Sequence, residues 1–400
     1  MEIEILDETR LRYWCGRIDL PEAAIVELGK TAKAVVSSVQ LFRTFIDFHE
    51  KTVGRGEWHR LWSPLPFDRD VTAALGERTS LFYLLAYLSA LPYAEQEYIR
   101  RGIGLDIFHD TMVDIRTWLV HRYDLDGRWS FDQFSWIWRH LSCELFRLGR
   151  LQFMLKPFDG GVTAFRHKTS AEYVLLADPN VTLRAGGVAL GAGRSNPQDP
   201  FYREESRPEE MGWQAVFEAS PEGWRGHPIT PSGIVQPEAV FLASSTWERV
   251  LQNGDTVLDM HIPRKDPFTV ETCRDSLRSA FEFFHQQAPE RPFTASYCHT
   301  WFYTPQLQQI LPPESNIVLF QREAYLYPFP GTPGFLWDYV FGEKVKSLAT
   351  APRDTSLRRA VLDWMNAGRE LFDLAGVMFH GPDEWGSQPY MRRYDNRRLG

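Results

Sequence analysis

An aspartate and a histidine stand two residues apart near the end of one predicted strand, a spacing that could support general-base chemistry. The segment from 257 to 277 reads VLDMHIPRKDPFTVETCRDSL and predicts a strand, a short basic loop and a helix. Side chains alternate between the two faces of a strand, so Asp259 and His261 share one face. An imidazole titrates near neutral pH, and a neighbouring carboxylate can fix its tautomer. We therefore predict that Asp259 orients a base at His261. The alternative is a hydrogen-bonded histidine without chemistry.

The loop after this strand could hold an anion. Arg264 and Lys265 supply positive charge, and Thr269 is placed to cap the helix predicted from Thr269 to Gln287. The first turn of a helix presents backbone N–H groups and the positive end of the helix dipole. The loop and helix start together predict a site for phosphate groups.

Composition bounds the classes of function. The chain has 400 residues, 44% hydrophobic and 14% aromatic, which is enough for a large core and two or three domains. A formal charge of −8 argues against a nucleic-acid partner. Cys15, Cys143, Cys273 and Cys298 form no CxxC pair, so we expect no disulfide framework, no metal site and a reducing, cytoplasmic compartment.

No membrane association is expected from the sequence. The N-terminus is acidic and lacks the basic and apolar regions of a secretory signal. The most apolar early stretch, Ser80 to Leu91, is too short to cross a bilayer and has the periodicity of a buried helix.

The hydrophobic period changes near residue 150 and divides the chain. Before it, apolar residues recur every three or four positions, and Ser130 opens the last helix with a predicted capping box. The predicted helices are Glu22 to Leu28, Val35 to Glu50, Ser80 to Leu91, Tyr93 to Arg101, Leu105 to Tyr123 and Ser130 to Leu148.

After residue 150, β-branched and aromatic runs separated by turn residues predict strands, and later segments alternate between strand and helix. This order predicts a partly parallel core after an antiparallel meander. The predicted strands are Leu151 to Phe158, Glu172 to Leu176, Gln214 to Ala219, Ala239 to Ala243, Thr256 to Ile262, Phe293 to Trp301, Asn316 to Pro328 and Gly376 to His380. The predicted helices here are Thr269 to Gln287, Thr304 to Ile310 and Thr355 to Leu374.

These patterns predict an α+β protein with a helical domain at residues 1–149, a mixed α/β domain at 150–381 and a tail at 382–400. Several polar side chains are assigned structural roles at this level. They are His227 in a turn, Asp110, Asp114 and Arg116 on one helix, and Arg147 and Arg150 beside the change of period.

Several short stretches, in their order along the chain, resemble a bacterial family of two-domain GNAT-type N-acyltransferases, the group that includes the glycopeptide acyltransferase of teicoplanin biosynthesis. They span about Tyr98 to Ala360. The stretches are Tyr98 to Ile103, Asp110 to Arg116, Glu144 to Phe153, Arg225 to Ile229, the segment from His261 to Leu277, Cys298 to Trp301, Leu311 to Gln321 and Thr355 to Ala360.

The resemblance implies a helical N-terminal domain and a GNAT-like C-terminal domain that transfers an acyl group from coenzyme A to a small-molecule amine, such as an amino sugar. In that fold two parallel strands splay apart and admit the pantetheine arm; here they would be Thr256 to Ile262 and Phe293 to Trp301. One departure stands out: the glycine-rich pyrophosphate loop of the superfamily is replaced by the segment from Arg264 to Phe268. A glycine-containing match from Arg184 to Ala189 lacks an apolar helix after it.

The resemblance also suggests further site residues. His299 would lie near His261 as a second base or a pocket wall, and Tyr303 would be the acid toward the thiolate. Trp224 and Trp301 could line an acyl or acceptor pocket, although a tryptophan is most often part of a core.

Two alternatives stay open. The first is a catalytically degenerate GNAT-like binding or interaction protein, which the missing glycine loop favours. The second is a thiol-dependent hydrolase in which His261 reaches Cys298 across the strands; Cys298 and His299 are adjacent and face opposite sides of their strand. The acyl chain, the acceptor and the oligomeric state are not determined by the sequence.

Overall fold

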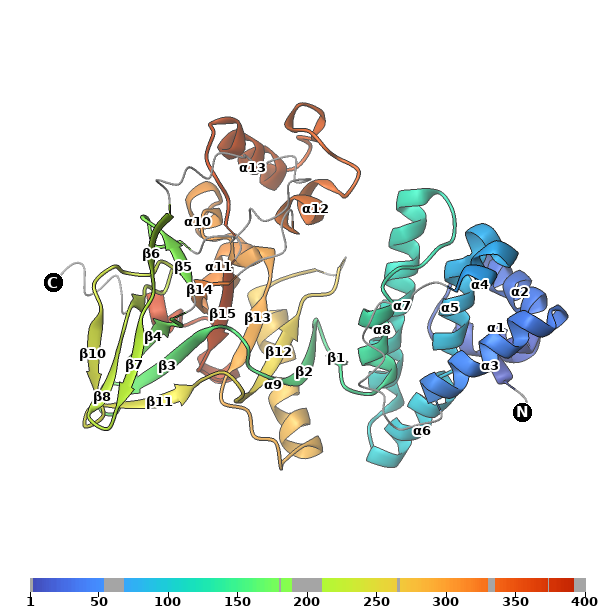
Figure 1. Ribbon diagram of the computed structural model, residues 1–400, viewed down its shortest axis with the longest axis horizontal. Helices are drawn as coiled ribbons and strands as arrows, with labels where there is room; N and C mark the ends of the chain where they lie inside the picture. Colours follow the sequence, from blue (N-terminus) through green and yellow to red (C-terminus); the bar gives the residue numbers. More distant parts are fainter. Residues whose placement is uncertain are drawn as a thin grey trace. The chain divides into compact units, whose positions relative to one another are not determined.

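The computed structural model describes residues 3–53, 68–179, 181–188, 211–264, 267–329, 335–372 and 374–391. The chain forms two compact units (Figure 1). The first comprises Met1–Leu148 with Gln152–Met154 and Pro263–Asp266, and the second comprises Gly149–Leu151, Leu155–Ile262 and Pro267–Gly400. Helices form the first unit and a mixed α/β arrangement forms the second, which confirms the predicted α+β class.

The first unit is a set of helices around α5, in which every side chain except that of Ser80 is buried. Its helices end where the sequence places glycine: Gly102 and Gly127 adopt left-handed conformations with φ of 68° and 69° at the ends of α6 and α7. The helices are α1 (Glu8–Arg17), α2 (Glu22–Ser37), α3 (Val39–Val53), α4 (Arg69–Leu75), α5 (Thr79–Leu88), α6 (Leu91–Arg101), α7 (Leu105–Asp126) and α8 (Phe134–Leu141).

The single helix predicted from Ser130 to Leu148 is wrong. The structure has α8 followed by strand β1 (Phe146–Leu148). Cys143 takes a left-handed backbone with φ of 57°, which no α-helix can contain. The predicted capping box is also wrong, because Ser130 donates to Asp126 and the helix starts later without a side-chain cap.

A buried ion pair joins α7 to α8. Asp114 is 3% exposed and His140 is fully buried, and Asp114 Oδ2 lies 3.3 Å from His140 Nε2. The indole N–H groups of Trp118 and Trp136 donate to the same carboxylate oxygen at 3.1 and 2.7 Å. His140 Nδ1 lies 3.0 Å from the Trp136 carbonyl oxygen, and His140 Nε2 lies 3.2 Å from Gln152 Nε2, so both ring nitrogens have polar neighbours.

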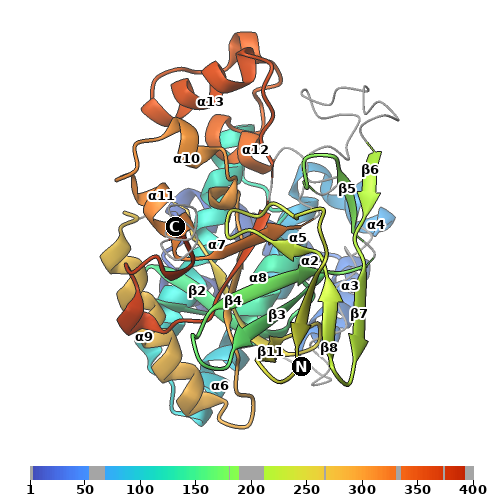
Figure 2. The ribbon, with the colours of Figure 1, turned by 90° about the vertical axis from the view of Figure 1, so that its left-hand side faces the viewer.

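The second unit is built around the strands β12, β13, β15 and β14, which are neighbours in that order in a sheet with the full order β1-β2-β12-β13-β15-β14. Strands β12 and β13 are parallel, whereas β13 and β14 both run antiparallel to β15. This mixed sheet agrees with the predicted partly parallel core. Figure 2 shows helix α9 on the opposite side of the unit from strands β7 and β8. The strands of this sheet are β2 (Leu151–Pro157), β12 (Thr256–His261), β13 (Ser296–His299), β14 (Tyr325–Pro328) and β15 (Leu374–Met378), with β1 as given above.

Smaller antiparallel sheets complete the β-structure, with the orders β11-β3-β4-β9, β10-β8-β7 and β5-β6. One apolar core contains residues of the β11-β3-β4-β9 sheet. It also contains residues on the face of the large sheet that carries Val257, Tyr297 and Tyr327. These strands are β3 (Val162–His167), β4 (Tyr173–Ala177), β5 (Thr182–Arg184), β6 (Met211–Gln214), β7 (Phe217–Ser220), β8 (Gly223–Gly226), β9 (Pro228–Ile229), β10 (Val240–Ala243) and β11 (Trp247–Leu251).

Along the sequence, the helices of the second unit lie between strands of the large sheet. The predicted helix from Thr355 to Leu374 ends early, because Gly368 turns the chain with φ of 74° ahead of β15. A second core is formed among α10, α12 and α13. The helices are α9 (Val270–Gln287), α10 (Leu307–Ile310), α11 (Asn316–Arg322), α12 (Phe335–Phe341) and α13 (Ser356–Asn366).

The prediction of a strand from Asn316 to Pro328 is correct for its second half, which is β14, and wrong for its first half. Its first half is helix α11, capped by the Ser315 side chain, which accepts from the Val318 N–H. The Gln321 amide fixes that helix by donating to the carbonyls of Phe302 and Thr304 at 2.7 and 2.8 Å. Apolar periodicity alone cannot separate such a short buried helix from a strand.

Candidate active site

Two histidines occupy the carboxyl ends of the parallel strands β12 and β13. The register of these strands pairs Leu258 with Ser296 and Asp259 with Tyr297. Both strands continue two residues past the last pair, to His261 and His299. The carboxyl ends of parallel strands meet at one edge of a sheet, so both imidazoles stand at the same edge, beyond the paired region.

The predicted neighbourhood of Asp259 and His261 is present. His261 Nε2 lies 3.2 Å from Asp259 Oδ2, and the side chains are 25% and 4% exposed. The carboxylate and the imidazole are thus close enough to interact electrostatically. The arrangement places a histidine with a neighbouring carboxylate at the partly exposed end of β12.

His299 differs from His261 in its charge state. Burial lowers the pKa of His299 to about 4; the positive charge of Lys156 and the His261 ring act in the same direction, and Asp259 opposes them. Its ring centroid is 4.6 Å from that of Phe329. His299 is therefore a neutral imidazole at ordinary pH, suited to accept a hydrogen bond or form a pocket wall.

Lys156, which the sequence analysis missed, also faces this group. Its ammonium lies 3.1 Å from Asp159 Oδ1 and 3.9 Å from Asp259 Oδ2, and 4.4 Å from the ring centroid of Tyr297. The available signal was a lysine inside the otherwise apolar strand from Leu151 to Phe158.

Cys298 and Tyr303 lie on the other face of the sheet. Burial raises the pKa of the Cys298 thiol well above its ordinary value, so a thiolate is disfavoured and the hydrolase alternative loses its nucleophile. Tyr303 is fully buried, its ring stacks on that of Phe320 at 5.6 Å, and its hydroxyl has no hydrogen-bond partner among the described residues. The structure thus separates Tyr303 from the histidines by the thickness of the sheet.

Gly376 makes room for the Tyr303 ring. A Cβ atom at Gly376 would lie 2.8 Å from Tyr303 Cε2 and 2.8 Å from Ala324 Cβ. We expect Gly376→Ala to displace Tyr303, to destabilise the fold by about 1–3 kcal/mol and to slow turnover. Thermal unfolding and steady-state kinetics would measure both effects. Gly381→Ala, where a Cβ would meet nothing within 4 Å, is the matched control. Unchanged stability and rate in Gly376→Ala would contradict this packing argument.

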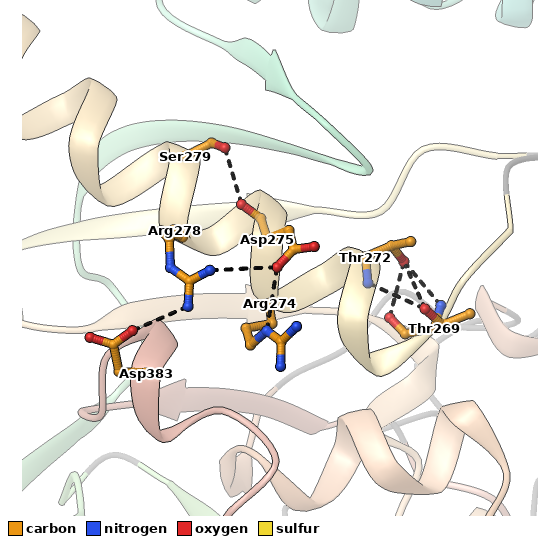
Figure 3. A network of polar contacts seen from close by, with 7 residues as sticks. All are labelled: Thr269, Thr272, Arg274, Asp275, Arg278, Ser279 and Asp383. Atoms are coloured by element: carbon orange, nitrogen blue, oxygen red, sulfur yellow. Dashed lines mark hydrogen bonds and ion pairs between the residues drawn. The ribbon is translucent and has the colours of Figure 1, made fainter.

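The predicted anion site is only partly as expected. Thr269 does cap α9, but its hydroxyl oxygen accepts from the Thr272 N–H while its own N–H donates to the Thr272 hydroxyl (Figure 3). Glu271, in the first turn, has its pKa lowered by hydrogen bonds from its own N–H and from Thr269. The helix start is therefore already supplied with acceptors, so an incoming phosphate would have to compete with them.

The two basic residues of the segment after β12, Arg264 and Lys265, cannot be described together. Arg264 is grouped with the first unit, where its guanidinium is 5.3 Å from the Trp118 ring centroid. Lys265 lies outside the described residues. The glycine-containing match at Arg184 to Ala189 is a turn where described: the Arg184 N–H donates to Val188 and Gly187 has φ of 75°, while Ala189 lies outside the described residues.

Arg150 holds the segment that replaces the glycine-rich loop. Its Nε donates to the Pro267 carbonyl at 2.9 Å, and its guanidinium lies 5.3 Å from the Phe268 ring centroid. The sequence analysis assigned Arg150 a structural role, and here it fixes the backbone just before Thr269. The backbone before Thr269 is therefore held by a side chain from the turn that precedes β2.

The two predicted pocket tryptophans lie in separate clusters. Trp224, on β8, packs against the core of Phe165, Leu176 and Leu242, with its ring 4.8 Å from that of Phe165. Trp301 follows β13 directly and packs against the α10–α12–α13 core. Trp301 is thus two residues from His299, whereas Trp224 is in a structural core.

The described ranges contain neither a metal-ion cluster nor a helix that could span a membrane. No group of three or more His, Cys, Asp or Glu side chains in the described ranges is arranged to hold a metal ion. No helix in those ranges combines the length and apolarity needed to cross a membrane.

A helical unit precedes a mixed sheet with two parallel strands, the arrangement expected of a GNAT-like acyltransferase. Comparison with known proteins specifies the family. Residues 9–143 match the N-acyltransferase N-terminal domain, and residues 145–378 match the GNAT-like C-terminal domain. The second match covers more than half of the chain, so the protein belongs to this two-domain N-acyltransferase family and is an enzyme, as the sequence resemblance predicted.

Solved structures show the same fold at low identity. An acyltransferase in complex with decanoyl-CoA and teicoplanin is 19% identical with a TM-score of 0.59, over 92% of this chain and 86% of that one. An acyltransferase variant in complex with octanoyl-CoA is also 19% identical with a TM-score of 0.59, over 92% and 87%. An acyltransferase with decanoyl-CoA is 16% identical with a TM-score of 0.57, over 93% and 88%. No curated protein matched the chain.

Proposed function

We propose that this protein transfers an acyl group from acyl-CoA to a primary amine by direct attack. The observation that carries the proposal is His261, held 3.2 Å from Asp259 at the end of β12, beyond the last residue paired with β13. Family membership supports an acyltransferase, and the similar solved structures were determined with acyl-CoA or CoA, one of them also with teicoplanin and another with 10C-teicoplanin.

In the proposed reaction the amine nitrogen attacks the thioester carbonyl carbon and forms a tetrahedral intermediate. His261 accepts a proton from that nitrogen, and Asp259 stabilises the resulting imidazolium. The carbon–sulfur bond then breaks, giving an amide and the coenzyme A thiolate. The proton released by the amine ends on the thiolate, so the step balances without a further reactant.

The proposed step assigns no role to Tyr303. Burial raises its pKa well above that of an ordinary phenol, so the hydroxyl stays protonated and is a poor acid. Its ring packs beside Gly376, on the face of the sheet opposite the histidines. The acid role that the resemblance suggested for Tyr303 is therefore not carried into the proposed reaction.

For the coenzyme, we propose the α9 start at Thr269 as a diphosphate contact, and Trp301 as a pocket wall beside His299. The acceptors already present around Thr269 favour the competing candidate, a GNAT-like binding protein without turnover. The two candidates differ in whether acyl-CoA binds and is consumed.

One experiment separates them. Thermal unfolding is measured with coenzyme A, octanoyl-CoA and decanoyl-CoA, and thiol release is measured with an amino sugar and with the matched sugar that carries hydroxyl in place of amine. Ligand at about 100 times its Kd should stabilise the fold by about 2.7 kcal/mol. We expect stabilisation, and thiol release with the amine only. No stabilisation at millimolar ligand and no thiol release would overturn the proposal.

A further inference from the structure

A buried carboxylate holds a loop of the chain that follows β15. Glu323, which is 1% exposed and directly follows α11, has Oε2 3.1 Å from His380 Nε2. Its other oxygen, Oε1, accepts from the Gln388 N–H at 3.3 Å. The Tyr390 hydroxyl lies 3.2 Å from His380 Nδ1. The segment from His380 to Gln388, which we call the C-terminal loop, is therefore held at both ends by one side chain.

The C-terminal loop places Trp385 against α11. The side chain is 7% exposed, and its ring centroid lies 5.8 Å from that of Phe320. Gly386 turns the chain directly after it, with φ of 95°. The indole N–H has no hydrogen-bond partner among the described residues. The contact with α11 therefore depends on the ring of Trp385 and not on its N–H group.

Phe320 connects this loop with the start of α9. Its ring centroid lies 5.1 Å from that of Phe268, the residue before the Thr269 cap. The Phe302 ring lies 5.0 Å from the same ring, and the Arg150 guanidinium lies 5.3 Å from it. A packed apolar residue before a helix cap fixes the angle at which the chain enters the helix. All of these residues belong to the second unit, so one continuous set of contacts runs from the C-terminal loop to the first turn of α9.

We propose that Trp385 is a positioning residue for the coenzyme: its ring holds Phe320 and Phe268 in place and so fixes the first turn of α9. This inference rests on the proposed function, because it takes the α9 start as the diphosphate contact. Its structural part, the link from Trp385 to the α9 start, concerns the protein without ligand. The N–H groups at a helix start point together at an anion only while the first turn keeps its geometry.

The test uses Trp385→Ala, which removes the ring, and Trp385→Phe, which keeps a ring against Phe320 and loses only the N–H without a partner. Trp247→Ala is the matched control, because Trp247 packs against the separate core that also contacts Trp224. Binding of octanoyl-CoA and of octanoyl-pantetheine, which has no phosphate, is measured on the full chain, together with kcat and KM. Hydrogen exchange of residues 268–273 is measured without ligand.

We expect Trp385→Ala to weaken octanoyl-CoA binding and raise its KM by about tenfold, the effect of losing one helix-terminus contact to a charged group. The change in kcat should stay within about threefold, because the reacting groups are untouched. Binding of octanoyl-pantetheine should change less than about twofold, and exchange of residues 268–273 should be faster. Trp385→Phe should match wild type, and Trp247→Ala should lower thermal stability without changing KM. Trp385→Leu replaces the alanine variant if that variant does not fold.

Octanoyl-CoA affinity within about twofold of wild type in the variant without the ring would overturn the inference, and so would an equal loss for both thioesters. Unchanged exchange of residues 268–273 would overturn its structural part. A wild-type protein that binds neither thioester, while the exchange of the variant is faster, would overturn the proposed function and leave the link from Trp385 to α9 intact. The two failures are thus distinguishable.

Discussion

Replacing His261 by asparagine is expected to lower kcat/KM for acyl transfer by about 10²- to 10⁴-fold, the usual contribution of a general base. Asparagine keeps a polar side chain beside Asp259 but cannot take up a proton. The fold should be unaffected, because the His261 side chain is 25% exposed at the end of a strand. Thiol release at saturating acyl-CoA, with thermal unfolding as a check on folding, measures the effect.

His299→Asn is the matched control, since the same substitution is made at the same point of the neighbouring strand. Burial lowers the pKa of His299 to about 4, so an ionisation of the enzyme between pH 5 and 8 cannot come from this residue. We expect a smaller loss in kcat/KM for His299→Asn, with the wild-type pH dependence retained. If His261→Asn stays within about fivefold of wild type while His299→Asn loses activity, the two roles are reversed.

Replacing Asp114 by asparagine is expected to destabilise the helical unit by about 3–5 kcal/mol, because it breaks a buried contact pair and removes a carboxylate that accepts several hydrogen bonds. The carboxylate contacts the fully buried His140 and accepts from two indole N–H groups. Asp110→Asn is the matched control on the same helix, because Asp110 is 59% exposed and its change should stay within about 0.5 kcal/mol. Urea unfolding followed by far-UV circular dichroism, with hydrogen exchange in α7 and α8, gives the measurement.

This ion pair also predicts a pH dependence. Burial by itself would raise the pKa of Asp114, but the hydrogen bond and charge of His140, with Trp136 and Gln152, outweigh it and lower the pKa. A lowered carboxyl pKa stabilises the fold above the unfolded value, about 3.8, and this contribution is lost as the pH falls through the folded value. The wild type should therefore lose stability in acid more steeply than Asp114→Asn. If the stability of the two proteins fell equally steeply as the pH was lowered, the prediction would be contradicted.

Local patterns predicted much of the site. Alternation along one strand is enough to place Asp259 and His261 on one face, and the structure shows them 3.2 Å apart. Thr269 was predicted to cap a helix and does so. Both predictions depend on residues within a few positions of each other, where backbone geometry leaves little freedom.

The wrong secondary-structure predictions occur where the local preference of a segment competes with contacts to residues elsewhere in the chain. The run from Asn316 to Pro328 is apolar enough for a strand, yet its first half is helical because Ser315 caps it and Gln321 reaches carbonyls almost twenty residues away. The long helix predicted after Ser130 is interrupted at Cys143, whose left-handed backbone nothing in the pattern requires.

The sequence by itself determined the α+β class, the family, and the pairing of Asp259 with His261, because these depend on periodicity, on motif order and on neighbours along one strand. Only the tertiary structure decided that Lys156 joins them, that His299 is kept neutral by burial, and that Tyr303 and Cys298 lie on the opposite face. Those properties depend on which strands are adjacent and on what covers each side chain, and both are set by contacts between residues that are far apart in the sequence.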